Sequence, residues 1–471
     1  MIDVTMSSLK SMKYAGTITS RLFSIQHDGW SSISSNGYLG IIVNFIHICE
    51  KRGWMLSKLT LGCIPFDTSH TAKATLDLAN SVLKQLGLSQ DDIISSTQDN
   101  ASASFNTFAT VDEISQLPCI SHTAQLFIMH TVENVSKVND AINNIQAVCV
   151  ILRGNNSNDR VREIKRCCEA VGIKYLKVRL YGKTRWNSKE LMIRRFILLL
   201  PAIELFDEML IADSDKRNEF LILRSQAKRS IKFAELALPL MSWIAGWTQI
   251  LSSNHTSNIG MVRLFCKRLQ SFINTLSDQA EEYRRSQNLS ITNVCDELYD
   301  NAQDQFNAYF DKDFHDFWIY RFAEYFDCRT YGLIPNANRN AEKIRLKNEF
   351  IDHFTTEKEN TSPYVFYQRH GKTMDGDSLP EGEDDADFLN DVSASAVTPE
   401  YLPKNSLLTE EMSNYERLQK SVVGQYADPL QFWTDHHSKF PILSRIARVI
   451  LSIPVLLLQM SSACFPELES Q

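Results

Sequence analysis

The first 110 residues alternate between short apolar runs and polar breaks, a pattern typical of strands joined by turns. Runs rich in β-branched and aromatic residues predict four strands, over residues 22–28, 37–46, 54–64 and 93–97. Apolar residues at helical spacing predict a helix before the fourth strand, from a Thr68-Ser69 cap to Gly87. The short connections between the first three strands favour an antiparallel meander, which the helix joins to the fourth strand.

Beyond Pro118 the apolar positions follow the period of an α-helix. Residues 121–152 predict one long helix, and residues 189–353 are compatible with amphipathic helices throughout. Residues 371–405 lose the hydrophobic pattern and gain acidic residues, glycine and proline, which is typical of a disordered linker. The helical pattern then returns over residues 406–454.

The composition narrows the class of protein. The longest apolar stretches are short and contain proline, so no membrane span is expected. The first residues lack the basic-then-apolar pattern of a signal peptide, and we therefore expect an intracellular protein that is not secreted. The ten cysteines are scattered without a CxxC pair, which predicts reduced thiols and no structural zinc.

The net charge of −7 is distributed unevenly along the chain. Residues 374–391 hold eight acidic residues and no basic one, which accounts for the whole deficit. Residues 153–195 hold thirteen Lys or Arg residues and four acidic ones. Such a positive stretch attracts phosphate backbones through counterion release. The alternative is a solvated helical face whose charges have no ligand.

Two aspartates stand at the ends of predicted strands, where the chemistry of phosphoryl transfer would need them. Asp28 closes the first strand and Asp99 follows the fourth. Two-metal cleavage requires carboxylates that hold two Mg²⁺ or Mn²⁺ ions about 4 Å apart, and a sheet fixes the backbones that carry such carboxylates. Aspartate is also common past strand ends as a turn former, so topology alone leaves both interpretations open.

The residues around these aspartates resemble sequence blocks of the hAT superfamily of DNA transposases. The run DGWSS from Asp28 resembles the first-Asp block, and DNAS from Asp99 resembles the second. The run CISH that ends at His122 resembles the CxxH block, and TRWNS at residues 184–188 resembles a further block of the family. Residues 428–454 resemble its C-terminal dimerisation region. The five blocks occur in the family's order.

The resemblance implies a role for each block. Asp28 and Asp99 would be the metal ligands, and His122 would assist catalysis by binding phosphate or orienting a strand. An arginine can grip phosphate and an indole can stack on an extruded base. The residues expected to contact DNA are Trp30, Cys119, Lys183, Arg185 and Trp186. Two alternatives stay open, because His122 could be a satisfied histidine at a helix start and Trp30 could be core packing.

The resemblance also implies a fold class and a division of the chain. The fold would be α+β, with an RNase H-like mixed sheet split by a large all-helical insertion and followed by a C-terminal helical dimerisation segment. The expected segments are residues 1–198 of the catalytic core, the helical insertion 199–370, the linker 371–405 and the dimerisation region 406–471. One apolar helical face would form either the dimer surface or intramolecular core, and it comprises Ile442, Leu443, Ile446, Val449 and Ile450.

Departures from the family pattern lower the expected activity. The family begins with a BED-type zinc finger, whereas this chain begins just before the first-Asp block, so we expect it to be truncated. The family follows its Leu-Ser-Ile-Pro word with small residues and a Glu-Arg-x-Phe-Ser word, whose Glu supplies the third carboxylate. In this chain Pro454 is followed by Val-Leu-Leu-Leu-Gln-Met instead.

The sequence therefore predicts a transposable-element-derived, hAT transposase-like protein that binds DNA in the nucleus. It would form a homodimer or higher oligomer through residues 428–454. Its ancestral Mg²⁺- or Mn²⁺-dependent strand cleavage and transfer would be impaired, because the third carboxylate is missing. One alternative is a domesticated DNA-binding and dimerisation protein without catalysis, and another is a helical scaffold unrelated to the family.

Overall fold

A computed structural model of the chain describes two compact units. The sheet unit contains the described residues of 1–119, 251–264 and 316–471, and the helical unit contains those of 120–250 and 265–315. The structure describes residues 23–31, 37–49, 51–65, 71–85, 87–99, 107, 114–153, 158–182, 187–207, 211, 214–252, 256–333, 344, 347–348 and 404–457. Residues 371–403 of the expected linker lie outside the described residues, and its last two residues, Lys404 and Asn405, are helical.

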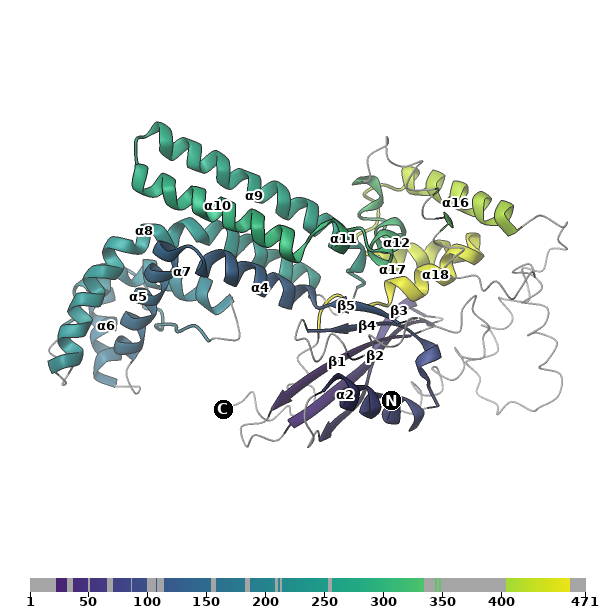
Figure 1. Ribbon diagram of the computed structural model, residues 1–471, viewed down its shortest axis with the longest axis horizontal. Coiled ribbons are helices and arrows are strands. Elements are labelled where there is room, and N and C mark those ends of the chain that lie inside the picture. Colours follow the sequence, from purple (N-terminus) through teal and green to yellow (C-terminus); the bar gives the residue numbers. More distant parts are fainter. Residues whose placement is uncertain are drawn as a thin grey trace. The chain divides into compact units, whose positions relative to one another are not determined.

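A five-stranded mixed sheet in the order β3-β2-β1-β4-β5 lies at the centre of the sheet unit (Figure 1). Its strands are β1 (Phe23–Ser31), β2 (Gly37–Cys49), β3 (Gly53–Pro65), β4 (Ile93–Gln98) and β5 (Ser115–Pro118). The first three strands pair antiparallel, which confirms the predicted meander. β4 runs parallel to β1, and β5 runs parallel to β4. The helix between β3 and β4 is α2 (Ala72–Gln85), as the apolar spacing predicts.

Two features of this region differ from the sequence-based expectation. β5 is four residues long, and its Ser-Gln-Leu-Pro sequence has no β-branched or aromatic residue that would indicate a strand. The helix expected over residues 121–152 is interrupted and forms α4 (Ile120–Glu133) and α5 (Ser136–Arg153). Val135 is fully buried at the junction, so the apolar spacing continues through the break and does not reveal it.

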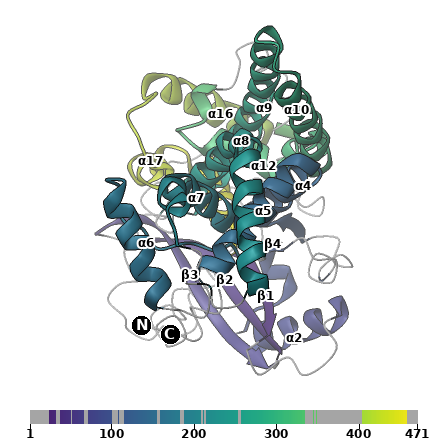
Figure 2. The ribbon, with the colours of Figure 1, turned by 90° about the vertical axis from the view of Figure 1, so that its left-hand side faces the viewer.

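β1 is a central strand that is covered on both faces. Its residues from Phe23 to His27 are all buried, including the polar side chains among them. Figure 1 shows α2 on one side of the sheet and α17 (Pro429–His436) with α18 (Pro441–Leu451) on the other, and Figure 2 shows α2 and α17 from a second side. α18 contacts β2, where Arg448 Nε donates to Ile46 O at 2.7 Å. α17 contacts β3, where Trp54 N donates to Thr434 Oγ1 at 2.8 Å.

The C-terminal helices are held by an aromatic cluster. Trp433 of α17 is fully buried and stacks between Trp54 of β3 (ring centroids 5.7 Å apart) and Tyr415 (5.4 Å) of α16 (Lys404–Ser421). Its indole N–H donates to Phe326 O, at the end of α12 (Trp318–Phe326), at 3.1 Å. One side chain therefore joins four elements of the sheet unit.

The apolar face of α18 faces the interior of the chain. Leu443, Ile446, Val449 and Ile450 are at most 4% exposed, and Ile442 is half-buried. The carboxylate of Glu411 in α16 accepts the first backbone N–H groups of this helix, at 3.0–3.1 Å from Ile442 N and 3.0 Å from Leu443 N. Of the two interpretations of this face, burial therefore supports intramolecular core.

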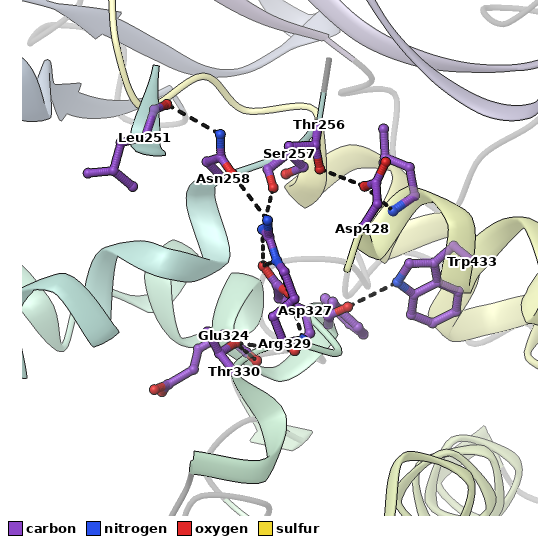
Figure 3. Close-up of polar contacts among 12 residues, drawn as sticks. Leu251, Thr256, Ser257, Asn258, Glu324, Asp327, Arg329, Thr330, Asp428 and Trp433 are labelled. Atoms are coloured by element: carbon purple, nitrogen blue, oxygen red, sulfur yellow. Dashed lines mark hydrogen bonds and ion pairs between the residues drawn. The ribbon is translucent and has the colours of Figure 1, made fainter. Parts of the chain in front are cut away.

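A polar network joins three distant segments of the sheet unit (Figure 3). The Arg329 guanidinium forms an ion pair with Asp327 at 2.6 Å and donates to Ser257 O at 2.6 Å and to Asn258 Oδ1 at 3.2 Å. Next to this cluster, the Thr256 hydroxyl donates to the Asp428 carboxylate, which caps α17, at 2.6 Å. The loop around residues 256–258 is thus held by both α17 and the turn after α12.

The helical unit is built from long helices. They are α4, α5, α6 (Asn158–Ala170), α7 (Asn187–Glu204), α8 (Ser214–Leu251), α9 (Val262–Arg285), α10 (Leu289–Tyr309) and the short α11 (Lys312–His315). Between α4 and α10, the Tyr309 hydroxyl lies 2.7 Å from His130 Nδ1. The unit begins at residue 120 rather than 199, because α4 packs with α10 while α5 and α6 pack with α7. Among the described helices, none is long and apolar enough to cross a membrane.

Candidate active site

The carboxylates of Asp28 and Asp99 are brought together by two adjacent parallel strands. Gln26 of β1 is the register partner of Thr97 of β4. Asp28 and Asp99 each lie two residues further, so they share the same edge and the same face of the sheet, since side chains alternate along a strand. Both side chains are half-buried. The register agrees with the sequence-based expectation that the sheet juxtaposes these two acids. The expectation that Asp28 closes its strand is wrong, because β1 continues to Ser31 through its pairing with β2.

The pair carries an excess of negative charge. Burial and the nearby Asp99 carboxylate together raise the pKa of Asp28 from 3.8 to about 6, against a backbone hydrogen bond from Gly29 that lowers it. The adjacent His27 supplies no compensating charge, because its complete burial lowers the pKa of its imidazole to about 4, despite Asp99 and a hydrogen bond with Gln98. A bound cation would relieve this repulsion.

The raised pKa of Asp28 predicts a specific pH dependence of stability. The folded state binds this proton more tightly than the unfolded state, so the stability due to Asp28 is present below pH 4 and is lost as pH rises to about 6. The loss should reach about 3 kcal/mol, because one pKa unit corresponds to about 1.4 kcal/mol. Asp28→Asn should lack it. Urea unfolding of both proteins at pH 4 and pH 7.5 measures the difference, and an equal pH response in the two would contradict the prediction.

The polar residues of β1 and β4 on the carboxylate face hold a segment from the C-terminal part of the chain. Ser24 Oγ donates to Ser452 O at 3.3 Å. Thr97 Oγ1 donates to Pro454 O at 2.9 Å. Both side chains are fully buried. Sequence reasoning assigned them no role, although fully buried polar residues in a central strand are unusual and could have drawn attention.

Cys119 joins the same arrangement. It follows β5 directly, and its N–H donates to Gln98 O at 2.7 Å, so it lies beside the residue that precedes Asp99. Its Sγ accepts the N–H of Leu457 at 3.3 Å, and it is 4% exposed. The thiol therefore contacts the chain itself, and its expected contact with DNA stays a prediction.

The structure describes the surroundings of the other predicted site residues only in part. His122 lies in the first turn of α4, which belongs to the helical unit, and its part in catalysis stays a prediction. Trp30 belongs to β1 and pairs with Tyr38, but its side chain is outside the described part. Lys183, Arg185 and Trp186 also lie outside the described residues.

Several cations of the basic stretch 153–195 are engaged locally. Arg166 pairs with Glu163 at 2.5 Å, and Lys189 pairs with Glu133 at 2.6 Å. Arg195 donates to Lys177 O at 2.9 Å. The Arg166 side chain is 64% exposed, so it stays accessible to solvent and to phosphate. These contacts are compatible with a positive surface and do not identify a ligand.

The donor set of the carboxylate pair fits a hard divalent cation in part. Carboxylate oxygens are the ligands that Mg²⁺ and Mn²⁺ prefer, and Asp28 and Asp99 supply two of them. Within the described ranges, no group of three or more His, Cys, Asp or Glu side chains is placed to hold a metal ion.

Two comparisons with known proteins bear on this arrangement. Residues 408–464 match the hAT family C-terminal dimerisation region. The chain is also similar to a Zea mays protein described as "Putative AC transposase", with 22% identity over 477 residues. That similarity covers 92% of this chain and 52% of the Zea mays protein. The chain thus spans about half the length of this curated relative.

Proposed function

Because the chain is a hAT superfamily transposase-like protein, we propose that it binds DNA and retains an impaired metal-dependent strand-cleavage site. The observation that carries this proposal is the placement of Asp28 and Asp99 at the same edge of two adjacent parallel strands. DNA, the divalent cation and a nuclear location are parts of the same proposal.

The topology of the sheet supports an RNase H-like core. Three antiparallel strands, a crossover helix and two further parallel strands give the order β3-β2-β1-β4-β5. In this order β1 and β4 are neighbours. Asp28 and Asp99 each lie two residues after a register pair of these strands, so the two acids come together. The helical unit would then be the insertion that divides this core in the sequence.

Asp28 and Asp99 would hold the cation. A bound Mg²⁺ or Mn²⁺ would activate the attacking oxygen and stabilise the leaving oxygen of a phosphodiester. The protein's own contribution is to keep two carboxylates together on a rigid sheet, where burial and their mutual repulsion raise the pKa of Asp28. His122, Arg185 and Trp186 would contact the DNA around the cleaved bond.

The expected impairment has a specific cause. Residues 452–457 run from the Ser24 contact to the contact with Cys119, whose N–H donates to the carbonyl of Gln98, the residue before Asp99. No Asp or Glu occurs in residues 455–466. A third carboxylate is therefore absent from the part of the sequence that follows Pro454 most closely, and two ligands bind a catalytic metal too weakly for fast chemistry.

A nicking assay tests the proposal. Supercoiled DNA incubated with the purified chain and Mg²⁺ or Mn²⁺ should show little or no nicking, and the double variant Asp28→Ala/Asp99→Ala should not differ from it. Mn²⁺ in the millimolar range should nevertheless raise the melting temperature of the wild-type protein, because it neutralises the carboxylates. The double variant should lose that increase. Efficient nicking that depends on both aspartates would contradict the impairment.

A second candidate function is DNA binding and self-association without any cleavage. The match of residues 408–464 to a dimerisation region favours self-association. Because the apolar face of α18 is buried within the chain, the contact between copies would use other surfaces of this region. Sedimentation of the purified protein measures the oligomeric state. A monomer at micromolar concentration would count against the proposed self-association.

A further inference from the structure

The segment of residues 452–457 is fastened to the sheet by side chains from three neighbouring strands. Ser24 belongs to β1, Thr97 belongs to β4, and Cys119 follows β5. We call these three side chains the clamp. The contacts join positions that are 428, 357 and 338 residues apart in the sequence. No local preference of the chain could bring them together.

The clamp contacts advance along the strands toward the carboxylate pair. Ser24 is the partner of Ser95 in the register of β1 and β4, and Thr97 is the partner of Gln26, two steps further along. Cys119 lies one step beyond the Gln98–Pro118 pair of β4 and β5, level with Asp99. The segment therefore moves from β1 across β4 to β5 and reaches the level of the carboxylates at Leu457.

The buried hydroxyl groups of Ser24 and Thr97 would destabilise the fold if they did not hold this segment. Burying a hydroxyl without a hydrogen-bond partner is destabilising. Thr97 and Ser24 are fully buried, and each donates to a carbonyl oxygen of the segment. An alanine or valine at either position would fill a β-strand equally well. Their polarity is therefore explained by the fastening of the segment.

We propose that Ser24, Thr97 and Cys119 are positioning residues that fix residues 455–457 as the β5-side wall of the carboxylate pair. Val455 is buried, and Leu456 and Leu457 are half-buried, so this wall is apolar and limits the access of water to Asp99. A drier surrounding makes the neutralisation of the carboxylates by a cation more favourable. The effect on metal binding rests on the proposed function, whereas the placement of the segment does not.

Disulfide trapping tests the placement. The variant Leu457→Cys puts a thiol on the residue whose backbone N lies 3.3 Å from the Cys119 sulfur, so the two thiols belong to residues in contact. Mild oxidation followed by peptide mass spectrometry should show a disulfide between Cys119 and the thiol introduced at position 457 in most molecules. Wild-type protein, with its native cysteines, gives the background, and Leu457→Cys/Cys119→Ser should give none. Failure of the link to form would overturn the placement.

Two matched variants test the role of Thr97. In the Leu457→Cys background, Thr97→Val keeps the shape but removes the donor, and it should slow the linking severalfold. Thr97→Ser keeps the hydroxyl and should restore the rate. Equal rates in all three proteins would overturn the positioning role. This readout reports where the segment lies, so a protein that is merely less stable but keeps the segment in place would not change it.

The Mn²⁺ affinity of variants at residue 457 provides a second readout, because these substitutions leave the residues of the strands unchanged. Leu457→Pro removes the N–H that contacts Cys119, whereas Leu457→Ala keeps it. Mn²⁺ titration followed by electron paramagnetic resonance should show affinity lower by about tenfold in the proline variant, with a smaller change in the alanine variant. An affinity in Leu457→Pro equal to that of Leu457→Ala would overturn the wall's effect. If the wild-type protein bound no Mn²⁺, the metal part of the proposed function would fail, while trapping would still decide the placement.

Discussion

Trp433→Ala is expected to lower the free energy of unfolding by about 3–5 kcal/mol, at the upper end for a truncated core residue. The indole is fully buried and stacks against both Trp54 and Tyr415, at interplanar angles of 18° and 11°. Truncation would leave a large cavity between the sheet and two C-terminal helices. It would also leave Phe326 O without the indole N–H that it accepts.

Trp433→Phe separates these two contributions. A phenyl ring keeps much of the stacking but cannot donate to Phe326 O, so this variant should lose less stability than Trp433→Ala. Urea unfolding followed by circular dichroism at 222 nm gives both values. A loss below about 1 kcal/mol in Trp433→Ala would show that the cluster does not join the C-terminal helices to the sheet.

Asp327→Ala is expected to cost about 3 kcal/mol, at the low end for breaking a buried ion pair, because it leaves the half-buried Arg329 guanidinium without its counter-ion. The Asp327 carboxylate is completely buried and accepts from Arg329 at 2.6 and 2.9 Å. Arg329 also donates to Ser257 O and Asn258 Oδ1. The variant should therefore loosen the 256–258 loop as well as the turn that carries the pair.

A double-mutant cycle measures the coupling within this pair. Asp327→Ala/Arg329→Leu removes both charges, so it should be less destabilised than the sum of the two single variants. Thermal unfolding of the four proteins gives the interaction free energy. If the two single variants changed the free energy of unfolding additively, the ion pair would not be the contact that organises this network.

The sequence predicts the fold best where neighbouring residues decide the structure. The meander of β1 to β3 follows from β-branched runs with short connections, and α2 follows from its apolar spacing. The juxtaposition of Asp28 and Asp99 could be expected from their places late in two strands that become neighbours, although Asp28 lies within β1 and only Asp99 follows its strand. Gly87, predicted as the helix end, adopts a positive φ of 70° that favours glycine.

The remaining parts of the site depend on partners that are distant in the sequence. Nothing near Ser24 or Thr97 indicates that their hydroxyls bind backbone carbonyls more than 350 residues away. The apolar face of α18 has the same spacing whether it packs on its own chain or on a second copy. β5 lacks the composition of a strand and forms because β4 offers an edge for it.

The contact between Arg448 of α18 and Ile46 of β2 spans 402 residues, so α18 is synthesised long after the sheet surface that it covers. At about 5–20 residues per second, a ribosome needs roughly 20–80 s to add the helix that covers a finished meander. During this interval the nascent chain exposes an apolar sheet surface, while the helices encoded in between can already pair with one another. We therefore expect biogenesis of this protein to depend on chaperones that shield the early strands.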